Sequence, residues 1–370
     1  MRVNTLNKPK RMGMQYRIMY VLSKLYFLPL HINIKNDGTI KVEFSFFCLQ
    51  SLVNAMLFSI SSIFTIVWTI SHTLYYEEYF TKAFNSVYAP SDVWIMVGFF
   101  GFGLTAPTFF ITWLIAYIWS QMNEVTRDPT IPFSKAYLAI FASPSLEICS
   151  YIIIFVGNYL ATYPLMEKYS FYENLLNIFV VVLIPTEISV MNHILMGIMM
   201  FALTERITYL IRNVQSGEDD IMKKVEIFSK YQKLMNLPIF GLVLIAQILW
   251  IVTMFFSFGL FVGDSKLETI PLTLSMIGYL FYSLAFLVFL KDMLFKLNDL
   301  NDSRVLLREA VEDLDIIDDK RRRLLLREVE RLKPLSGYGL FSVERSTLTS
   351  MVSVAITYLI ILIQFKMAIS

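Results

Sequence analysis

Long hydrophobic stretches separated by charged connections dominate this chain of 370 residues. Seven of the stretches approach or exceed the roughly 20 apolar residues that cross a hydrocarbon core about 30 Å thick. The pattern therefore predicts seven membrane-spanning helices. The predicted spans are residues 44–70, 93–119, 136–160, 175–203, 239–262, 272–290 and 347–369.

The last of these stretches carries polar residues at steps of three or four positions. On a helix that turns about 100° per residue, such positions share one narrow face. The other faces carry aliphatic side chains, which suit lipid or apolar neighbours. A membrane helix with one polar stripe either lines water or packs on another helix, and the spacing alone leaves both open. The positions on this face are Ser346, Ser350, Ser353, Thr357, Ile361, Gln364 and Ala368.

The composition supports a membrane protein and excludes a water-soluble globule. Hydrophobic residues make up 56% of the chain, and the mean hydropathy is +0.57. Such values are typical of a polytopic, all-α membrane protein. Cys48 and Cys149 both lie within hydrophobic stretches, so the sequence indicates no disulfide between outer loops.

The basic residues are distributed unevenly between the two sides of the predicted spans. Of the 32 lysines and arginines, 28 precede the first span or lie in the connections after spans two, four and six. Because positively charged connections stay in the cytoplasm, this predicts a cytoplasmic N-terminus and an extracellular C-terminus. That orientation is opposite to the one in G-protein-coupled receptors. The sequon Asn301-Asp302-Ser303 then falls in the cytoplasm, where it would not be glycosylated.

Amphipathic segments follow spans four and six. Residues 204–238 contain a capping pattern at 216–219, followed by Ile221, Val225 and Phe228 at helical spacing. Residues 291–346 contain similar apolar rows. We expect these inner extensions to pack on each other, although the basic run at 320–323 also suits a membrane surface. The predicted organisation is a cytoplasmic N-terminus (1–43), a six-helix ligand-binding bundle (44–290), a cytoplasmic anchor (291–346) and a seventh helix with the C-terminus (347–370).

The sequence contains no pattern that indicates an enzyme. It has no His, Cys and Asp spacing typical of a metal site, no glycine-rich phosphate loop and no nucleophile elbow. We therefore expect no catalytic residue, metal or cofactor. Glu187 and Glu147 lie within predicted spans, where an acid serves either ligand contact or hydrogen bonding between helices.

The string 357–365 within the last stretch reads Thr-Tyr, five aliphatic residues, then Gln-Phe. With the approach at 339–348, it resembles the signature of the insect gustatory receptors, whose motif positions here are Thr357, Tyr358, Gln364 and Phe365. The resemblance is specific over about the last 35 residues and architectural elsewhere.

This resemblance implies a ligand-gated, non-selective cation channel. It implies four subunits, with the seventh helix of each lining the pore, and an inner anchor where subunits meet. Gln364, Phe365 and Ile361 then form the gate near the extracellular mouth, and Thr357 and Ser353 line a wider vestibule below it. A lysine close to the pore mouth would repel cations, so Lys366 fits a cation channel only if its side chain turns toward lipid headgroups.

The outer halves of spans two to six mix aromatic and polar side chains. Such a mixture suits a small organic ligand with apolar surface and a few hydrogen-bonding groups. Bitter compounds and contact pheromones are favoured over sugars, because no acid-rich cluster is present. The candidate ligand-binding residues are Trp94, Tyr151, Asn158, Glu187, Thr253, Phe256 and Tyr279.

Three other classes compete with this interpretation. An odorant receptor of the same superfamily should lack the string at 357–365. A secondary transporter predicts inverted repeats, which are not visible, and a metabotropic seven-helix receptor predicts the opposite topology. We therefore expect a plasma-membrane protein of gustatory neuron dendrites. Its expected partners are a small-molecule tastant, membrane lipid and other gustatory receptor subunits in a homo- or heterotetramer, with no nucleic acid.

Overall fold

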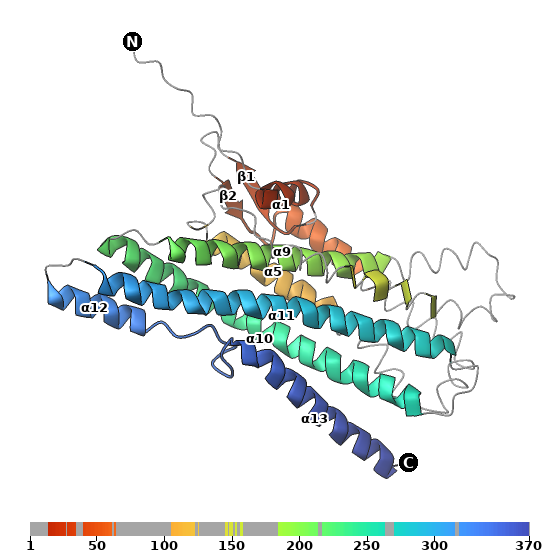
Figure 1. Ribbon diagram of the computed structural model, residues 1–370. Coiled ribbons are helices and arrows are strands. Elements are labelled where there is room, and N and C mark those ends of the chain that lie inside the picture. The colour runs from red at the N-terminus through yellow and green to blue at the C-terminus, as the bar shows by residue number, and fades with distance from the viewer. Residues whose placement is uncertain are drawn as a thin grey trace.

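The computed structural model of the chain places its helices in one elongated bundle (Figure 1). It describes residues 14–26, 28–34, 40–60, 63, 105–122, 125, 184–213, 217–262, 270–314 and 318–369, with a few positions between 145 and 157. The elements in these ranges are α1 (Met14–Lys24), β1 (His31–Ile34), β2 (Ile40–Glu43), the helix Leu49–Ile60, α5 (Thr105–Gln121), α9 (Ile184–Arg212), α10 (Glu218–Val262), α11 (Ile270–Glu312), α12 (Asp319–Glu330) and α13 (Arg345–Ile369).

Two helices run much further than one bilayer thickness. α10 has 45 residues and α11 has 43, so at 1.5 Å per residue each is about 65 Å long, against about 30 Å of hydrocarbon. The capping pattern at 216–219 does begin a helix, as predicted. That helix does not end before the fifth predicted span, however, and α10 continues through Pro238 to Val262.

Rows of apolar side chains at helical spacing hold the long helices together. α10 packs on α11, and α9 lies against α5 and α11. On the amphipathic part of α11, Leu300, Leu307 and Val311 are completely buried, and α12 covers this part with Leu325 and Val329. The extensions after the fourth and sixth predicted spans therefore pack on each other within one chain.

A small β-hairpin precedes the bundle and was not predicted. β1 and β2 pair antiparallel, with His31 opposite Glu43 and Ile34 opposite Ile40. Ser23, in α1, donates a hydrogen bond to Leu30 O (2.5 Å), and its oxygen accepts one from Ile32 N–H (3.3 Å). These bonds fasten α1 to the hairpin, which adds a minor β element to a helical protein.

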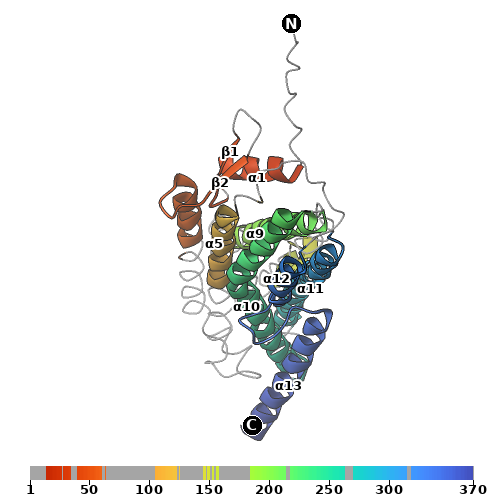
Figure 2. The same cartoon turned by 90° about the vertical axis from the view of Figure 1, so that its left-hand side faces the viewer.

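Three described helices are long and apolar enough to cross a membrane, namely Glu218–Phe255, Ile277–Glu312 and Arg345–Gln364. The first two are 44% and 50% buried within the chain over their most apolar windows, whereas the third is 17% buried. Figure 2 shows this third helix, α13, projecting from the side of the bundle opposite the β-hairpin. Of these three described helices, the last is thus covered least by its own chain.

Candidate pore helix and its attachment

α13 turns one face to the bundle and the opposite face away from it. Its buried residues follow one another at steps of four: Thr347 (8% exposed), Met351 (7%) and Ala355 (2%). At 100° per residue, Met351 and Ala355 lie about 120° and about 160° from Thr357 around the helix. Ser353 and Thr357 are exposed. The polar stripe predicted from the sequence therefore faces away from its own chain.

Two hydroxyl groups of the stripe hydrogen-bond within α13. Ser350 Oγ donates to Ser346 O (3.1 Å), and Thr357 Oγ1 donates to Ser353 O (2.9 Å). Such bonds to the preceding turn are common for serine and threonine in membrane helices. Gln364 has no comparable bond among the described residues, and its side chain is exposed. Its amide therefore needs water or another subunit as a partner when α13 lies in a membrane.

The first turn of α13 is capped by its own neighbours. Glu344 N–H donates to Thr347 Oγ1 (3.0 Å), and the same hydroxyl donates to Ser342 O (2.8 Å). Arg345 adds a contact with α11, because its guanidinium lies 6.0 Å from the centre of the Phe295 ring. The start of α13 is thereby held in place both by the preceding loop and by the bundle.

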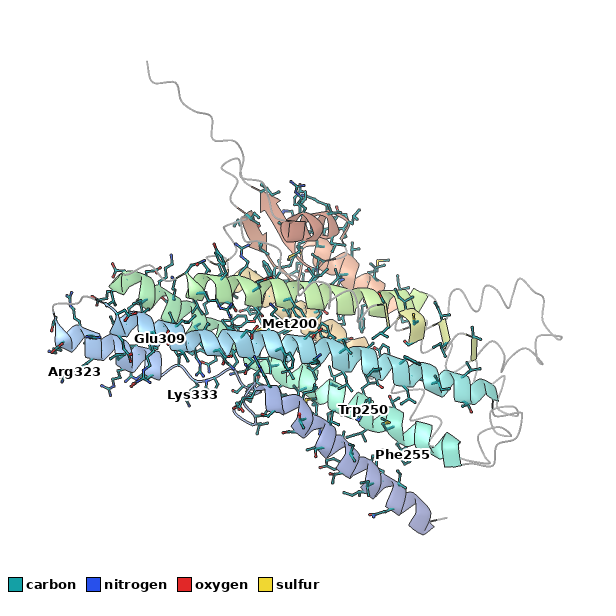
Figure 3. The ribbon with its side chains drawn as sticks, in the orientation of Figure 1. Met200, Trp250, Phe255, Glu309, Arg323 and Lys333 are labelled. Carbon is teal, nitrogen blue, oxygen red and sulfur yellow. The ribbon has the colours of Figure 1, made fainter. Side chains whose placement is uncertain are left out.

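The loop between α12 and α13 is a tight hairpin rather than an extended linker. Figure 3 shows Lys333 where this loop leaves α12. Val343 N–H donates to Leu335 O (2.8 Å), and Leu340 N–H donates to Gly337 O (2.9 Å) across a turn. The φ angles of Tyr338 (53°) and Gly339 (75°) are both positive, as in a type I′ turn. We call residues 332–344 the linker.

Replacing Gly339 with alanine is expected to lower the free energy of unfolding by about 1 kcal/mol, because a Cβ is strained at this left-handed φ. Thermal unfolding of the detergent-purified protein would measure the loss. Gly217→Ala is the matched control: an added Cβ there meets nothing within 4 Å, and its φ is not in the left-handed range. Equal losses in the two variants would contradict the turn assignment.

Two of the predicted ligand-binding side chains lie in the part of the chain that the structure describes. Thr253, on α10, is completely buried, and Tyr279, on α11, is partly buried. The backbones of Glu187 and Phe256 lie in α9 and α10, but their side chains are outside the described residues. Trp94, Tyr151 and Asn158 also lie outside the described residues, as does Glu147. The same holds for the side chain of Phe365, whose backbone belongs to α13.

A cavity of about 580 Å³ lies elsewhere, between the β-hairpin and the end of α5. It is lined by His31, Lys41, Glu43, Gln50 and Ser120, among others. Lys41 and Glu43 form an ion pair in its wall, and Gln50 Nε2 lies 3.0 Å from His31 Nδ1. Thr253 and Tyr279, the predicted ligand-binding residues whose side chains the structure describes, do not line this cavity.

Sequence reasoning missed the polar residues that hold the linker. Asn301, read as part of a sequon, is 5% exposed, and both polar atoms of its amide are hydrogen-bonded to the linker. A sugar therefore could not be attached without breaking these bonds. Gln232 and Asn236, four residues apart on α10, also reach the linker. The available signal was the spacing of polar residues on otherwise amphipathic helices.

The sequence profile of a family described as 7tm Chemosensory receptor matches residues 220–369, which include α11, α12 and α13 and nearly all of α10. Over these residues the chain is similar to a family of chemosensory receptors. The match covers the linker and the uncovered helix, so it coincides with the region where the sequence signature was found. No curated protein sequence matches the chain.

A solved structure resembles the chain over nearly its whole length. It is that of the insect olfactory receptor OR5 from Machilis hrabei in complex with eugenol, with a TM-score of 0.58 and 11% sequence identity. The alignment covers 94% of this chain and 97% of that one. At this identity the likeness concerns the fold. It confirms the predicted class of an all-α, helical fold, while the number of spans and the orientation of the termini stay predictions.

Proposed function

We propose that the chain is a gustatory receptor that works as a ligand-gated, non-selective cation channel opened by a small-molecule tastant. The single observation that carries the proposal is the surface of α13. This helix is apolar enough to cross a membrane, yet its own chain covers it poorly. Its uncovered face bears the polar stripe, with Thr357 and Gln364 exposed.

A polar stripe on one helix cannot enclose water, so the channel requires several copies around an axis. Four copies with their stripes turned inward would bring Ser353 and Thr357 to a vestibule and Ile361, Gln364 and Phe365 to a gate. Converging aliphatic and aromatic side chains exclude water when they are close and conduct when they separate. We propose a homo- or heterotetramer with other gustatory receptor subunits in the dendritic plasma membrane of taste neurons.

The ligand would bind in the outer part of the bundle, where Thr253 and Tyr279 lie on α10 and α11. These two helices contact both each other and α13. A ligand that binds the open arrangement more tightly would therefore shift the closed pore toward opening. Bitter compounds and contact pheromones are the favoured classes.

Whole-cell current tests the proposal. Cells expressing the chain, alone or with other gustatory receptor subunits, are given bitter compounds, sugars and cuticular lipids while G-protein signalling is blocked. A cation current that survives the block and changes its gating or permeation in Gln364→Ala and Phe365→Ala is expected. Ile356→Ala is the control, since Ile356 is 48% exposed but lies about 100° from the stripe.

A current that disappears under the block would overturn the channel and favour a metabotropic receptor. Uptake of a labelled compound without any conductance would favour a secondary transporter instead. Both alternatives leave α13 as a packing helix, in which case Gln364→Ala and Ile356→Ala should have similarly small effects.

A further inference from the structure

The buried side chain of Asn301, on α11, bridges the two ends of the linker. Its Nδ2 donates to Val343 O (2.9 Å), and its Oδ1 accepts from Leu335 N–H (2.8 Å). These two residues are also joined to each other by the Val343 N–H to Leu335 O bond. One amide thus holds both strands of the hairpin at the point where they pair, and α13 begins two residues after Val343.

A row of side chains on α10 holds the same linker from the other side. Gln232 Nε2 donates to Lys333 O and to Pro334 O, both at 3.0 Å. Asn236, one turn later, donates an amide N–H to Ser336 O (2.8 Å) when its side-chain amide is oriented with the nitrogen toward the linker. Phe240, another turn later, meets the Tyr338 ring edge-on at 6.0 Å. Positions spaced by four share one face of a helix, so this row follows the linker along its length.

The row spans the point at which α10 lacks a backbone donor. Pro238 lies between Asn236 and Phe240 and cannot donate the usual hydrogen bond to the preceding turn. Helices bend most readily at such positions. The part of α10 beyond Pro238 carries Thr253, a candidate ligand contact, so a bend here would move that part relative to Gln232.

We propose that Asn301, Gln232 and Asn236 are positioning residues. They transmit movement of the bundle to the pore helix. This inference rests on the proposed channel function. The linker is fastened to α10 on both sides of Pro238 and to α11 through Asn301. A change in the angle of α10 therefore shifts the base of α13, rather than being absorbed by a flexible loop.

The burial of the Asn301 hydrogen bonds makes them costly to break. Asn301 is 5% exposed, so removing its amide leaves the Leu335 N–H and the Val343 carbonyl without these partners. Unsatisfied buried groups are costly, so the linker would move to find water or other partners. The base of α13 would then move with it, and the balance between closed and open pores would change.

Labelling of a cysteine in the stripe tests the proposal without knowledge of the ligand. Cys48→Ser and Cys149→Ser remove both cysteines of the chain, and Thr357→Cys adds one. Intact cells are treated with a membrane-impermeant, biotin-tagged methanethiosulfonate. The labelling rate is measured per chain at the surface, together with the current that is lost when external Na⁺ is replaced by N-methyl-D-glucamine.

Asn301→Leu, which keeps similar volume but loses both bonds, is expected to change the labelling rate or the surface-normalised current at least about fivefold, the lower range of typical coupling. Asn301→Asp keeps an acceptor for Leu335 N–H and should show a smaller change. The matched control is Asn298→Leu, one turn away on α11. Asn298 donates to Asp302 Oδ2 (3.1 Å), on its own helix and near the surface, and its replacement should leave both readouts unchanged.

The outcomes separate this inference from the channel itself. If Thr357→Cys is never labelled in any background and carries no Na⁺ current, the pore assignment fails. If Thr357→Cys is labelled, but adding Asn301→Leu leaves the labelling rate and the current at the parental values, as adding Asn298→Leu does, the pore assignment stands. The positioning role is then overturned. If Asn301→Leu does not reach the surface, Gln232→Leu and Asn301→Asp decide, and parental values in both would also overturn it.

Discussion

Replacing Thr357 with lysine is expected to reduce the cation current through the assembled channel about thirtyfold. Thr357 is exposed on the polar stripe of α13, so the proposed tetramer places four such side chains around the pore. At a distance of about 8 Å in a water-filled vestibule, each ammonium raises the energy of a passing cation by about 0.5 kcal/mol, and four raise it by about 2 kcal/mol. Single-channel conductance, together with the reversal potential in Na⁺ and Cl⁻ gradients, measures the effect.

Thr357→Met is the matched control, because methionine adds length without charge. A similar loss in both variants would mean that bulk, not charge, blocks the vestibule. Unchanged conductance in Thr357→Lys, with normal surface expression, would contradict the assignment of this face to the ion path.

The largest expected loss of stability comes from Trp119. This residue ends the buried face of α5, is completely buried and donates its indole N–H to Met199 O on α9 (2.8 Å). Trp119→Ala removes both the ring and this bond, so we expect the free energy of unfolding to fall by about 3–5 kcal/mol. Trp119→Phe keeps most of the volume and should cost about 1–2 kcal/mol for the lost hydrogen bond. Thermal unfolding in detergent, followed by tryptophan fluorescence or circular dichroism, measures both.

Trp113 provides the comparison within the same helix. It also donates to a partner, Asn54 Oδ1 (2.8 Å), but it is only partly buried. Trp113→Ala should therefore lower stability less than Trp119→Ala. The reverse order would show that the contact between α5 and α9 is not a main support of the bundle.

The sequence predicted the fold best where hydrophobic periodicity is long and uniform. The last predicted span and α13 agree to within a few residues, and the rows ending at Val311 and Val329 are buried as their spacing indicated. The prediction failed where a helix continues through a residue that usually ends one. The inner extension was predicted to end at residue 238 and the fifth span to begin at 239, but α10 continues through Pro238 and packs on neighbouring helices.

The N-terminal hairpin was missed for a different reason. Ile32 and Ile34 alternate with polar residues, as do Ile40 and Val42, which is the period of a half-buried strand. Each run is only four residues long. A pattern so short carries little weight beside spans of more than twenty residues.

The candidate site was predictable only as far as it is periodic. The spacing placed the polar residues on one face of α13, and the structure shows that this face is exposed. The hydrogen bonds of Asn301 do not follow from any spacing, because their partners lie 34 and 42 residues away along the chain. Long-range contacts between a side chain and a turn depend on how helices meet, which a single sequence does not state.

The poor cover of α13 has a consequence for how the receptor is made. A newly inserted, solitary chain would present Gln364 and the stripe hydroxyls to the hydrocarbon, where an amide without water or a partner is unfavourable. Assembly of the proposed tetramer would remove that exposure. Assembly would therefore both build the proposed pore and shield the polar face of each α13 from lipid.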